Sequence, residues 1–177
     1  MQTMLRSAGT LTLTLTVLAI AGCGIEQQDH LAESRATWRE LADGSGDTYS
    51  YLVSTYSWTG YQSLTALQFE SGVGTYRLLE SNGVSFQPGS TAPLVLEWEE
   101  RGADVGSHLN GAAVATVDQL YDRCAKEVLS QDRNQNTITL EFDNRGILGV
   151  CTYRPTNCAD DCTIGVWIEN LMMGKTY

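Results

Sequence analysis

The five cysteines have the clearest chemistry in this sequence, because thiols can form disulfides or bind a metal ion. They are Cys23, Cys124, Cys151, Cys158 and Cys162. Cys23 follows an apolar N-terminal segment, and the other four form an even set that predicts two disulfides in an oxidising compartment. Sequence spacing leaves all three connectivities of four cysteines open. Zinc is the competing interpretation, but three residues separate Cys158 from Cys162, and no second close pair or nearby histidine completes a ligand set.

Candidate acid–base residues are few. The only histidines are His30 and His108. His108 lies in a Gly-Ser-His-Leu-Asn segment without a nucleophile motif, and a catalytic set needs a base that a third group orients. Two adjacent acid pairs have the residue types of a general acid and base; they are Glu99–Glu100 and Asp160–Asp161. In a chain this acidic such pairs are more often solvated, so we predict no catalytic residue.

Two segments rich in side-chain oxygens are candidates for calcium binding. Asp132, Asn134 and Asn136 place side-chain oxygens at alternate positions, as the start of an EF-hand loop does. Thr137 stands where that loop needs glycine, and Asp143 stands where it needs glutamate. A polar turn is therefore the favoured interpretation, and we predict no metal site and no cofactor. The same holds for a second oxygen cluster, formed by Asn157, Asp160 and Asp161.

The N-terminus has the pattern of an export signal. Arg6 supplies the positive start, and residues 10–20 form an apolar centre that is shorter than the roughly 20 residues of a membrane span. The segment Leu-Ala-Ile-Ala-Gly-Cys at 18–23 resembles the lipobox of bacterial lipoproteins. The resemblance implies a diacylglycerol thioether on Cys23, cleavage after Gly22 and acylation of the new N-terminus, for example with palmitate. Two alternatives are a β-strand, from the Leu–Thr alternation at 11–16, and an ordinary secretory signal before a free cysteine.

These features predict an address outside the cytoplasm, with the membrane reached through lipid on Cys23. Gly24 stands where an aspartate would retain a lipoprotein in the inner membrane, so the outer membrane is favoured if the host has one. Residues 23–177 hold all 21 acidic residues and 10 of the 11 basic ones, which gives a formal charge of −11. Such a surface repels phosphate backbones, and nucleic acid is not an expected partner.

Two helices are predicted in the exported part. Residues 23–30 are polar and predict a flexible tether after the lipidated cysteine. Residues 31–43 then predict a helix, with Leu31, Trp38 and Leu41 near one face and Gly44 at its end. The second helix begins at Thr116, where Gln119 completes a capping box. Its apolar stripe consists of Val117, Leu120, Tyr121, Cys124 and Val128.

The remaining segments alternate in the manner of strands joined by tight turns, which favours an antiparallel sheet. Strands are expected within 47–60 and at 62–70, 75–80, 84–87, 93–99, 137–142, 147–153 and 163–170. Several aromatic side chains near the first two strands could line a ligand groove, although packing in the sheet core explains them equally well. They are Tyr49, Tyr51, Tyr56, Trp58 and Tyr61.

One disulfide pairing follows from these elements. Cys124 lies on the apolar stripe of the second helix, and Cys151 lies on one strand face with Ile147. A Cys124–Cys151 bridge would join helix to sheet and leave Cys158–Cys162 to close a loop. We predict this pairing.

Several short motifs together resemble an uncharacterised family of bacterial envelope lipoproteins, known as domain of unknown function 6174. They are Trp38, the Thr-Tyr-Ser-Tyr segment at 48–51, residues 116–122, and Phe142-Asp143 with Gly146. The resemblance spans most of 35–170. The family has no assigned activity, so the resemblance implies an envelope location and no chemistry.

The sequence thus predicts a signal peptide at 1–22, a lipidated cysteine with its tether at 23–30, and a single α+β domain at 31–177. The domain is expected to be an antiparallel sheet with two helices packed on one face. The predicted function is a non-enzymatic binding or interaction module with a possible envelope protein as its partner. The alternative is a small extracytoplasmic hydrolase or metal-dependent enzyme that uses Asp or Glu side chains.

Overall fold

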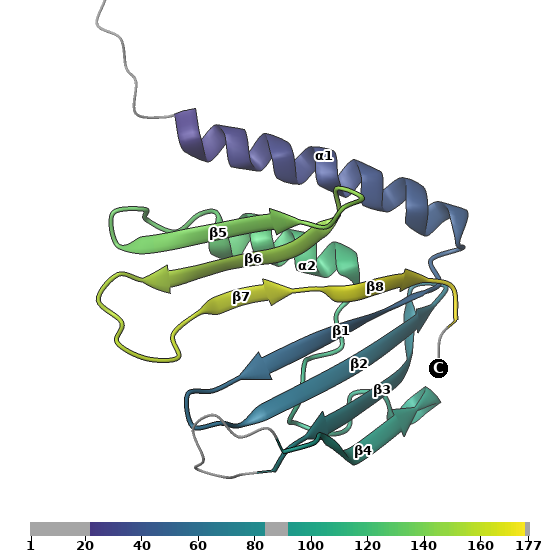
Figure 1. Ribbon diagram of the computed structural model, residues 1–177. Helices are drawn as coiled ribbons and strands as arrows, with labels where there is room; N and C mark the ends of the chain where they lie inside the picture. The colour runs from purple at the N-terminus through teal and green to yellow at the C-terminus, as the bar shows by residue number, and fades with distance from the viewer. Residues whose placement is uncertain (1–21, 84–91, 176–177) are drawn as a thin grey trace, which may run out of the picture.

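The computed structural model describes residues 22–83 and 92–175, and it confirms an α+β fold built on antiparallel strands (Figure 1). The helices are α1 (Gly22–Gly44) and α2 (Val117–Arg123), which a π-helical turn continues to Val128. A short 3-10 turn, Gly102–Asp104, follows β4. The strands are β1 (Tyr49–Tyr56), β2 (Gln62–Glu70), β3 (Val73–Ser81), β4 (Val95–Arg101), β5 (Asn136–Phe142), β6 (Leu148–Pro155), β7 (Ile164–Trp167) and β8 (Glu169–Met173). The predicted strand at 84–87 and residues 1–21 of the predicted leader lie outside the described residues.

The strands form two sheets rather than the single sheet that was predicted. The large sheet has the order β4-β3-β2-β1-β8, and the small sheet has the order β5-β6-β7. The strand predicted at 163–170 is divided at Ile168. The Ile168 N–H still donates to Gly149 O of β6 over 2.8 Å, whereas the next residue, Glu169, already lies opposite Leu52 of β1. As a result, β7 ends as an edge of the small sheet, and β8 continues as an edge of the large one (Figure 1).

The first helix is longer than predicted. Leu31, Ser34, Trp38 and Ala42 are buried at helical spacing, as an amphipathic helix requires. The prediction of a flexible tether at 23–30 is wrong, because α1 already begins at Gly22. The segment is rich in Glu and Gln, which are good helix formers. The Arg133 guanidinium also donates a hydrogen bond to the Gln27 side chain and so ties this end of the helix to the turn before β5.

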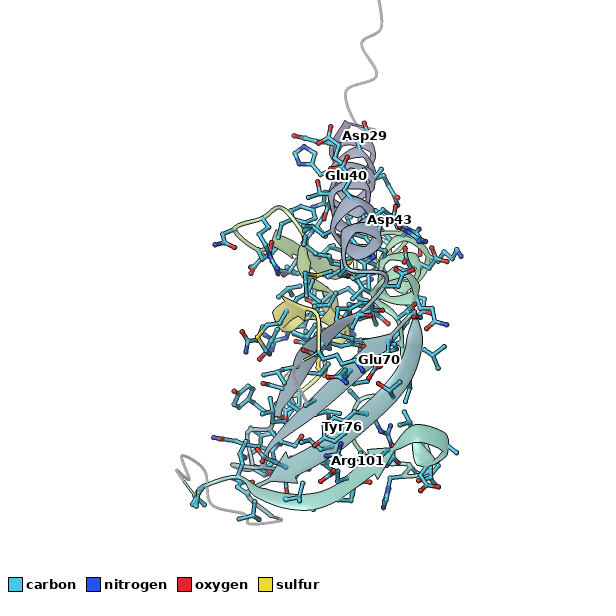
Figure 2. All side chains as sticks on the ribbon, turned by 90° about the vertical axis from the view of Figure 1, so that its right-hand side faces the viewer. Asp29, Glu40, Asp43, Glu70, Tyr76 and Arg101 are labelled. Atoms are coloured by element: carbon cyan, nitrogen blue, oxygen red, sulfur yellow. A yellow bond between two sulfur atoms is a disulfide. The ribbon has the colours of Figure 1, made fainter. Side chains whose placement is uncertain are left out.

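α1 contacts the large sheet through aromatic side chains, whereas α2 and its π-helical turn lie mainly against β6 and β7 of the small sheet. The Trp38 ring meets Tyr49 edge-on at 4.8 Å, and Tyr49 stacks on Phe69 at 5.0 Å. On the opposite face, where strand register places Tyr76, the Arg101 guanidinium lies 4.5 Å from the Tyr76 ring centroid (Figure 2). The face of the large sheet that carries Tyr49 and Phe69 therefore contributes to the main core.

The predicted disulfide pairing and the predicted cap of the second helix are confirmed. The Cα atoms of Cys124 and Cys151 lie 5.6 Å apart in a disulfide that joins the π-helical turn to β6. Cys158 and Cys162 pair within the loop between β6 and β7. Thr116 caps α2, with reciprocal bonds between Thr116 and Gln119. The Cys124–Cys151 disulfide therefore joins the end of the second helix to the small sheet.

Candidate functional site

A cleft lies where the two sheets separate. β8 pairs with the first half of β1, at Tyr49, Ser50 and Leu52, and no pairing joins β7 to the second half of β1 in the described chain. The two strands diverge from that point (Figure 1). The resulting inter-sheet cleft has a volume of about 750 Å³ and is lined by residues 53–57 on one side and by Thr163, Gly165, Val166 and Trp167 on the other.

Side-chain hydrogen bonds join the two sides of this cleft. Where the strands begin to diverge, Ser54 Oγ donates to Glu169 Oε2 over 2.7 Å. Farther out, the Asp161 carboxylate accepts from Ser57 Oγ at 2.8 Å and from the Trp58 N–H at 3.1 Å. Asp161 lies between Cys158 and Cys162, so the short disulfide loop holds the carboxylate opposite the β1–β2 turn. The cleft is thus framed at two points along its length.

The floor of the cleft comes from α2 and from the chain just before it. Residues 111–113 and Ala115 line it together with Leu120 and Arg123 of α2. Tyr51 Oη donates to Ala115 O over 2.6 Å, and burial raises the pKa of the Tyr51 hydroxyl above its usual value. The phenol therefore stays protonated, keeps donating at any physiological pH and holds the floor against β1.

The lining is mostly aromatic, aliphatic and hydroxyl-bearing, which is typical of a binding surface. Of its charged side chains, Asp161 is already engaged by the β1–β2 turn. Arg123 contacts Glu127 through Nε at 3.5 Å. Among the described residues no bond to the Arg123 terminal nitrogens is found, so the guanidinium has donors for a ligand.

A buried ion pair positions the loop that forms this floor. Arg77 and Glu100 face each other across β3 and β4, with 4% and 1% of their side chains exposed. Their contact is bidentate, at 2.8 and 3.0 Å. The same guanidinium donates to His108 O at 2.6 Å and to Ala112 O at 3.0 Å. Arg77 therefore links the sheet directly to the cleft floor at Ala112.

Glu100 binds the other end of the same loop. Its carboxylate accepts from the backbone N–H groups of Gly106 and His108 at 2.7 and 2.6 Å, and from Ser107 Oγ at 3.1 Å. Burial alone would raise the pKa of Glu100, but the hydrogen bonds from Arg77, His108 and Gly106 outweigh it and hold that pKa well below its usual range. Glu100 is thus a buried anion that organises the loop.

The histidine predicted to lie in a surface loop belongs to this cluster. The His108 ring stacks on Trp98 at 4.5 Å, and its Nδ1 lies 3.0 Å from Glu100. Trp98 also contacts Arg77, whose guanidinium carbon is 4.6 Å from the ring centroid. The prediction that Glu100 is solvated is wrong, because its carboxylate is buried against Arg77. Sequence spacing gives no sign that Arg77 turns inward.

The predicted aromatic groove is found in part. Tyr51, Tyr56 and Tyr61 line the cleft, whereas Tyr49 lies in the core and Trp58 is exposed outside the lining. Sequence reasoning missed the opposite wall, because β7 is far from these tyrosines in the chain. The sequence predicts Thr163 to Trp167 only as part of a final strand, and no local signal distinguishes an edge that faces a cleft from one that faces solvent.

The predicted polar turn at Asp132 is present: Asp132 Oδ1 accepts from the Asn134 N–H at 2.9 Å and from its side-chain amide at 3.0 Å. Across the described ranges no three His, Cys, Asp or Glu side chains are arranged to hold a metal ion. The outer side of α1 carries acidic side chains, among them Asp29, Glu40 and Asp43 (Figure 2). No helix in the described part of the chain is long and apolar enough to cross a membrane.

The fold and cleft together define an α+β domain whose two sheets separate around a cleft with a mixed aromatic and polar lining. No family model, no curated protein and no solved structure matches this chain.

Proposed function

We propose that this protein is a lipid-anchored lipoprotein of the bacterial envelope that binds a ligand in the inter-sheet cleft without chemical conversion. The cleft itself carries the proposal. It combines aromatic walls formed by Tyr56, Tyr61 and Trp167 with hydroxyl groups and one cation, as binding sites with few directed polar groups do. His30 and His108 do not line it, so the cleft residues pair no nucleophile with an oriented histidine base.

The envelope location rests on the lipobox-like segment that ends at Cys23 and on the two cysteine pairs. Disulfides persist in oxidising spaces, which agrees with export. The outer membrane is the proposed location where the host has one. Because α1 begins at Gly22, the lipidated residue would lie at the start of this helix, without a flexible tether before the body. Membership of the family with domain of unknown function 6174 is part of this proposal and adds no activity to it.

Filling the cleft tests its role directly. Ala113 lines the cleft and is exposed, so Ala113→Trp adds bulk there without entering the core. The full chain in detergent is titrated with a fragment library of amino acids, short peptides, sugars and aromatic acids, and binding is followed by ligand-observed NMR. We expect fragments that bind the wild type to lose at least about tenfold in affinity for Ala113→Trp, since the indole occupies their site.

The matched control places the same bulk elsewhere. Ala36 is exposed on α1 and does not line the cleft, so Ala36→Trp should bind the fragments as the wild type does. Fragments that bind Ala113→Trp and the wild type equally would place the binding site outside the cleft and contradict the proposal.

Replacing Cys23 tests the anchor. Cys23→Ser removes the thiol to which the proposed diacylglycerol is attached, and each acyl methylene contributes about 0.8 kcal/mol of membrane affinity. We expect the variant to accumulate with its leader uncleaved and without lipid. The measurement is the intact mass of the purified chain, with detergent phase partitioning of a variant that also has the leader removed. A wild-type chain with the leader present and a free thiol at position 23 would contradict the anchor.

A further inference from the structure

The second half of β1 offers an unpaired backbone edge to the cleft. The Ser57 N–H donates to Tyr61 O over 2.9 Å, which makes residues 57 and 61 a hydrogen-bonded pair. Hydrogen-bonded and non-bonded pairs alternate along antiparallel strands, so Tyr56 and Ser54 point their backbone groups away from β2. Thr48 is an even number of residues from Ser54, so its backbone groups point to the same side of β1. Its carbonyl accepts from the Gly174 N–H after β8. Beyond β8, this edge of β1 faces the cleft.

A matching edge lies on β7. The Ile168 N–H bonds to Gly149 O, so the same alternation turns the backbone groups of Trp167 and Gly165 away from β6 and toward the cleft. Gly165 has a φ of +153°, and a Cβ there would collide with the Cys151 carbonyl. A residue other than glycine is therefore strained at this position of β7.

We propose that the occupant of the cleft is an extended peptide segment that lies between these two edges as an additional strand. This inference rests on the proposed function and specifies its ligand. Strands 4.7–4.9 Å apart bond directly, and two edges that diverge around a cleft present unused N–H and C=O groups that a peptide backbone complements. Because β1 and β8 are antiparallel and β7 runs into β8, the added strand is antiparallel to one edge and parallel to the other.

The side chains on the two sides of the cleft fit such an occupant. Alternate side chains of a strand point to opposite faces, so every second residue of the peptide would point at the floor formed by Leu120 and Arg123. The remaining residues would lie on the outer face, beside the rings of Tyr56 and Trp167. Arg123 is the one cation of the lining, and it complements an acidic side chain on the inward face.

A proline at position 56 removes the peptide-facing donor and little else. The Tyr56 N–H is not used by β2, and its side chain is 69% exposed, so Tyr56→Pro keeps the β1–β2 ladder. Tyr56→Ala is the matched control, because it loses the same ring and keeps the N–H. The full chain in detergent is screened against a bead-bound library of random peptides of about five residues, the commonest strand length. We expect the tightest peptide to bind Tyr56→Pro about tenfold more weakly than Tyr56→Ala, the loss of one hydrogen bond.

The peptide backbone gives a second test that needs no protein variant. The tightest peptide is resynthesised twice, with N-methyl groups on one or the other set of alternate residues. Both forms are expected to bind the wild type at least about tenfold more weakly, since each set donates to a different edge. Undiminished binding of either form overturns the proposal, and so does a library that yields no binder sensitive to Ala113→Trp. If sugars or aromatic acids bind in an Ala113→Trp-sensitive way and no peptide does, the cleft remains a binding site and only the peptide inference fails.

Discussion

Replacing Glu100 with glutamine is expected to lower the free energy of unfolding by about 3–5 kcal/mol, because it leaves the buried Arg77 guanidinium without its counter-charge. Both side chains are almost completely buried, so water cannot solvate the remaining cation. Urea unfolding followed by tryptophan fluorescence at pH 7 measures the loss. The amide also cannot accept all the bonds that the carboxylate takes from Gly106, Ser107 and His108.

The neighbouring residue on β4 gives the matched control. Glu99 pairs with Arg101 at the surface, where the two side chains are 34% and 64% exposed. Glu99→Gln is the same chemical change in a solvated pair, and it should cost at most about 1 kcal/mol. Equal losses for Glu99→Gln and Glu100→Gln would show that the buried pair has no special role.

The difference between wild type and Glu100→Gln should depend on pH in one direction. The folded pKa of Glu100 is lowered, so its stabilising contribution is fully present above the unfolded pKa of about 4.5 and declines as the pH falls toward the folded pKa. Below pH 4.5 the difference in unfolding free energy should shrink by up to about 1.4 kcal/mol per pH unit. Because Asp122, Asp143 and Glu70 titrate in both proteins, subtracting the two curves isolates Glu100.

The features that sequence predicted correctly are encoded locally. Thr116 and Gln119 form a capping box within one helical turn, and the structure shows both of its hydrogen bonds. Leu31 and Trp38 recur with the period of a helix, and both are buried in α1. Each signal lies within a few residues of the structure it specifies, so one sequence is sufficient to read it.

The features that were missed depend on distant partners. The sequence alone predicts that Arg77, a charged residue in a strand, is solvated. Only its register opposite Glu100 makes it part of a buried cluster. The polar segment at 23–30 has no repeat of apolar residues in its sequence that would mark it as helix, although its composition allows one. The cleft lies where the chain passes from the small sheet to the large one. Ile168 still bonds to Gly149 of β6, and Glu169 already pairs with Leu52 of β1, a change of partner that no local pattern marks.

Removing the Cys124–Cys151 disulfide is expected to cost about 3.5 kcal/mol of stability, the chain-entropy value for a closed loop of this size. The two cysteines are 27 residues apart and completely buried, and they join the π-helical turn after α2 to the centre of the small sheet. The double variant Cys124→Ala/Cys151→Ala, measured by urea unfolding against the wild type, gives the loss. The same variant should also weaken ligand binding at the cleft, because Arg123 immediately precedes Cys124 and is held in place through it.

Removing the second disulfide tests how much of the stability from these bonds comes from chain entropy and how much from local contacts. Cys158 and Cys162 are only 4 residues apart, so the same relation gives about 2 kcal/mol for Cys158→Ala/Cys162→Ala. That loop carries Asp161, whose bonds to Ser57 and Trp58 frame the cleft. The loss of binding free energy for the ligand should therefore exceed the loss of unfolding free energy. If the short loop proves more important for stability than the long one, chain entropy is not the main contribution of these bonds. The pairing of α2 with β6 would then rest on the packing of Tyr121, whose hydroxyl accepts the Leu148 N–H at 2.9 Å.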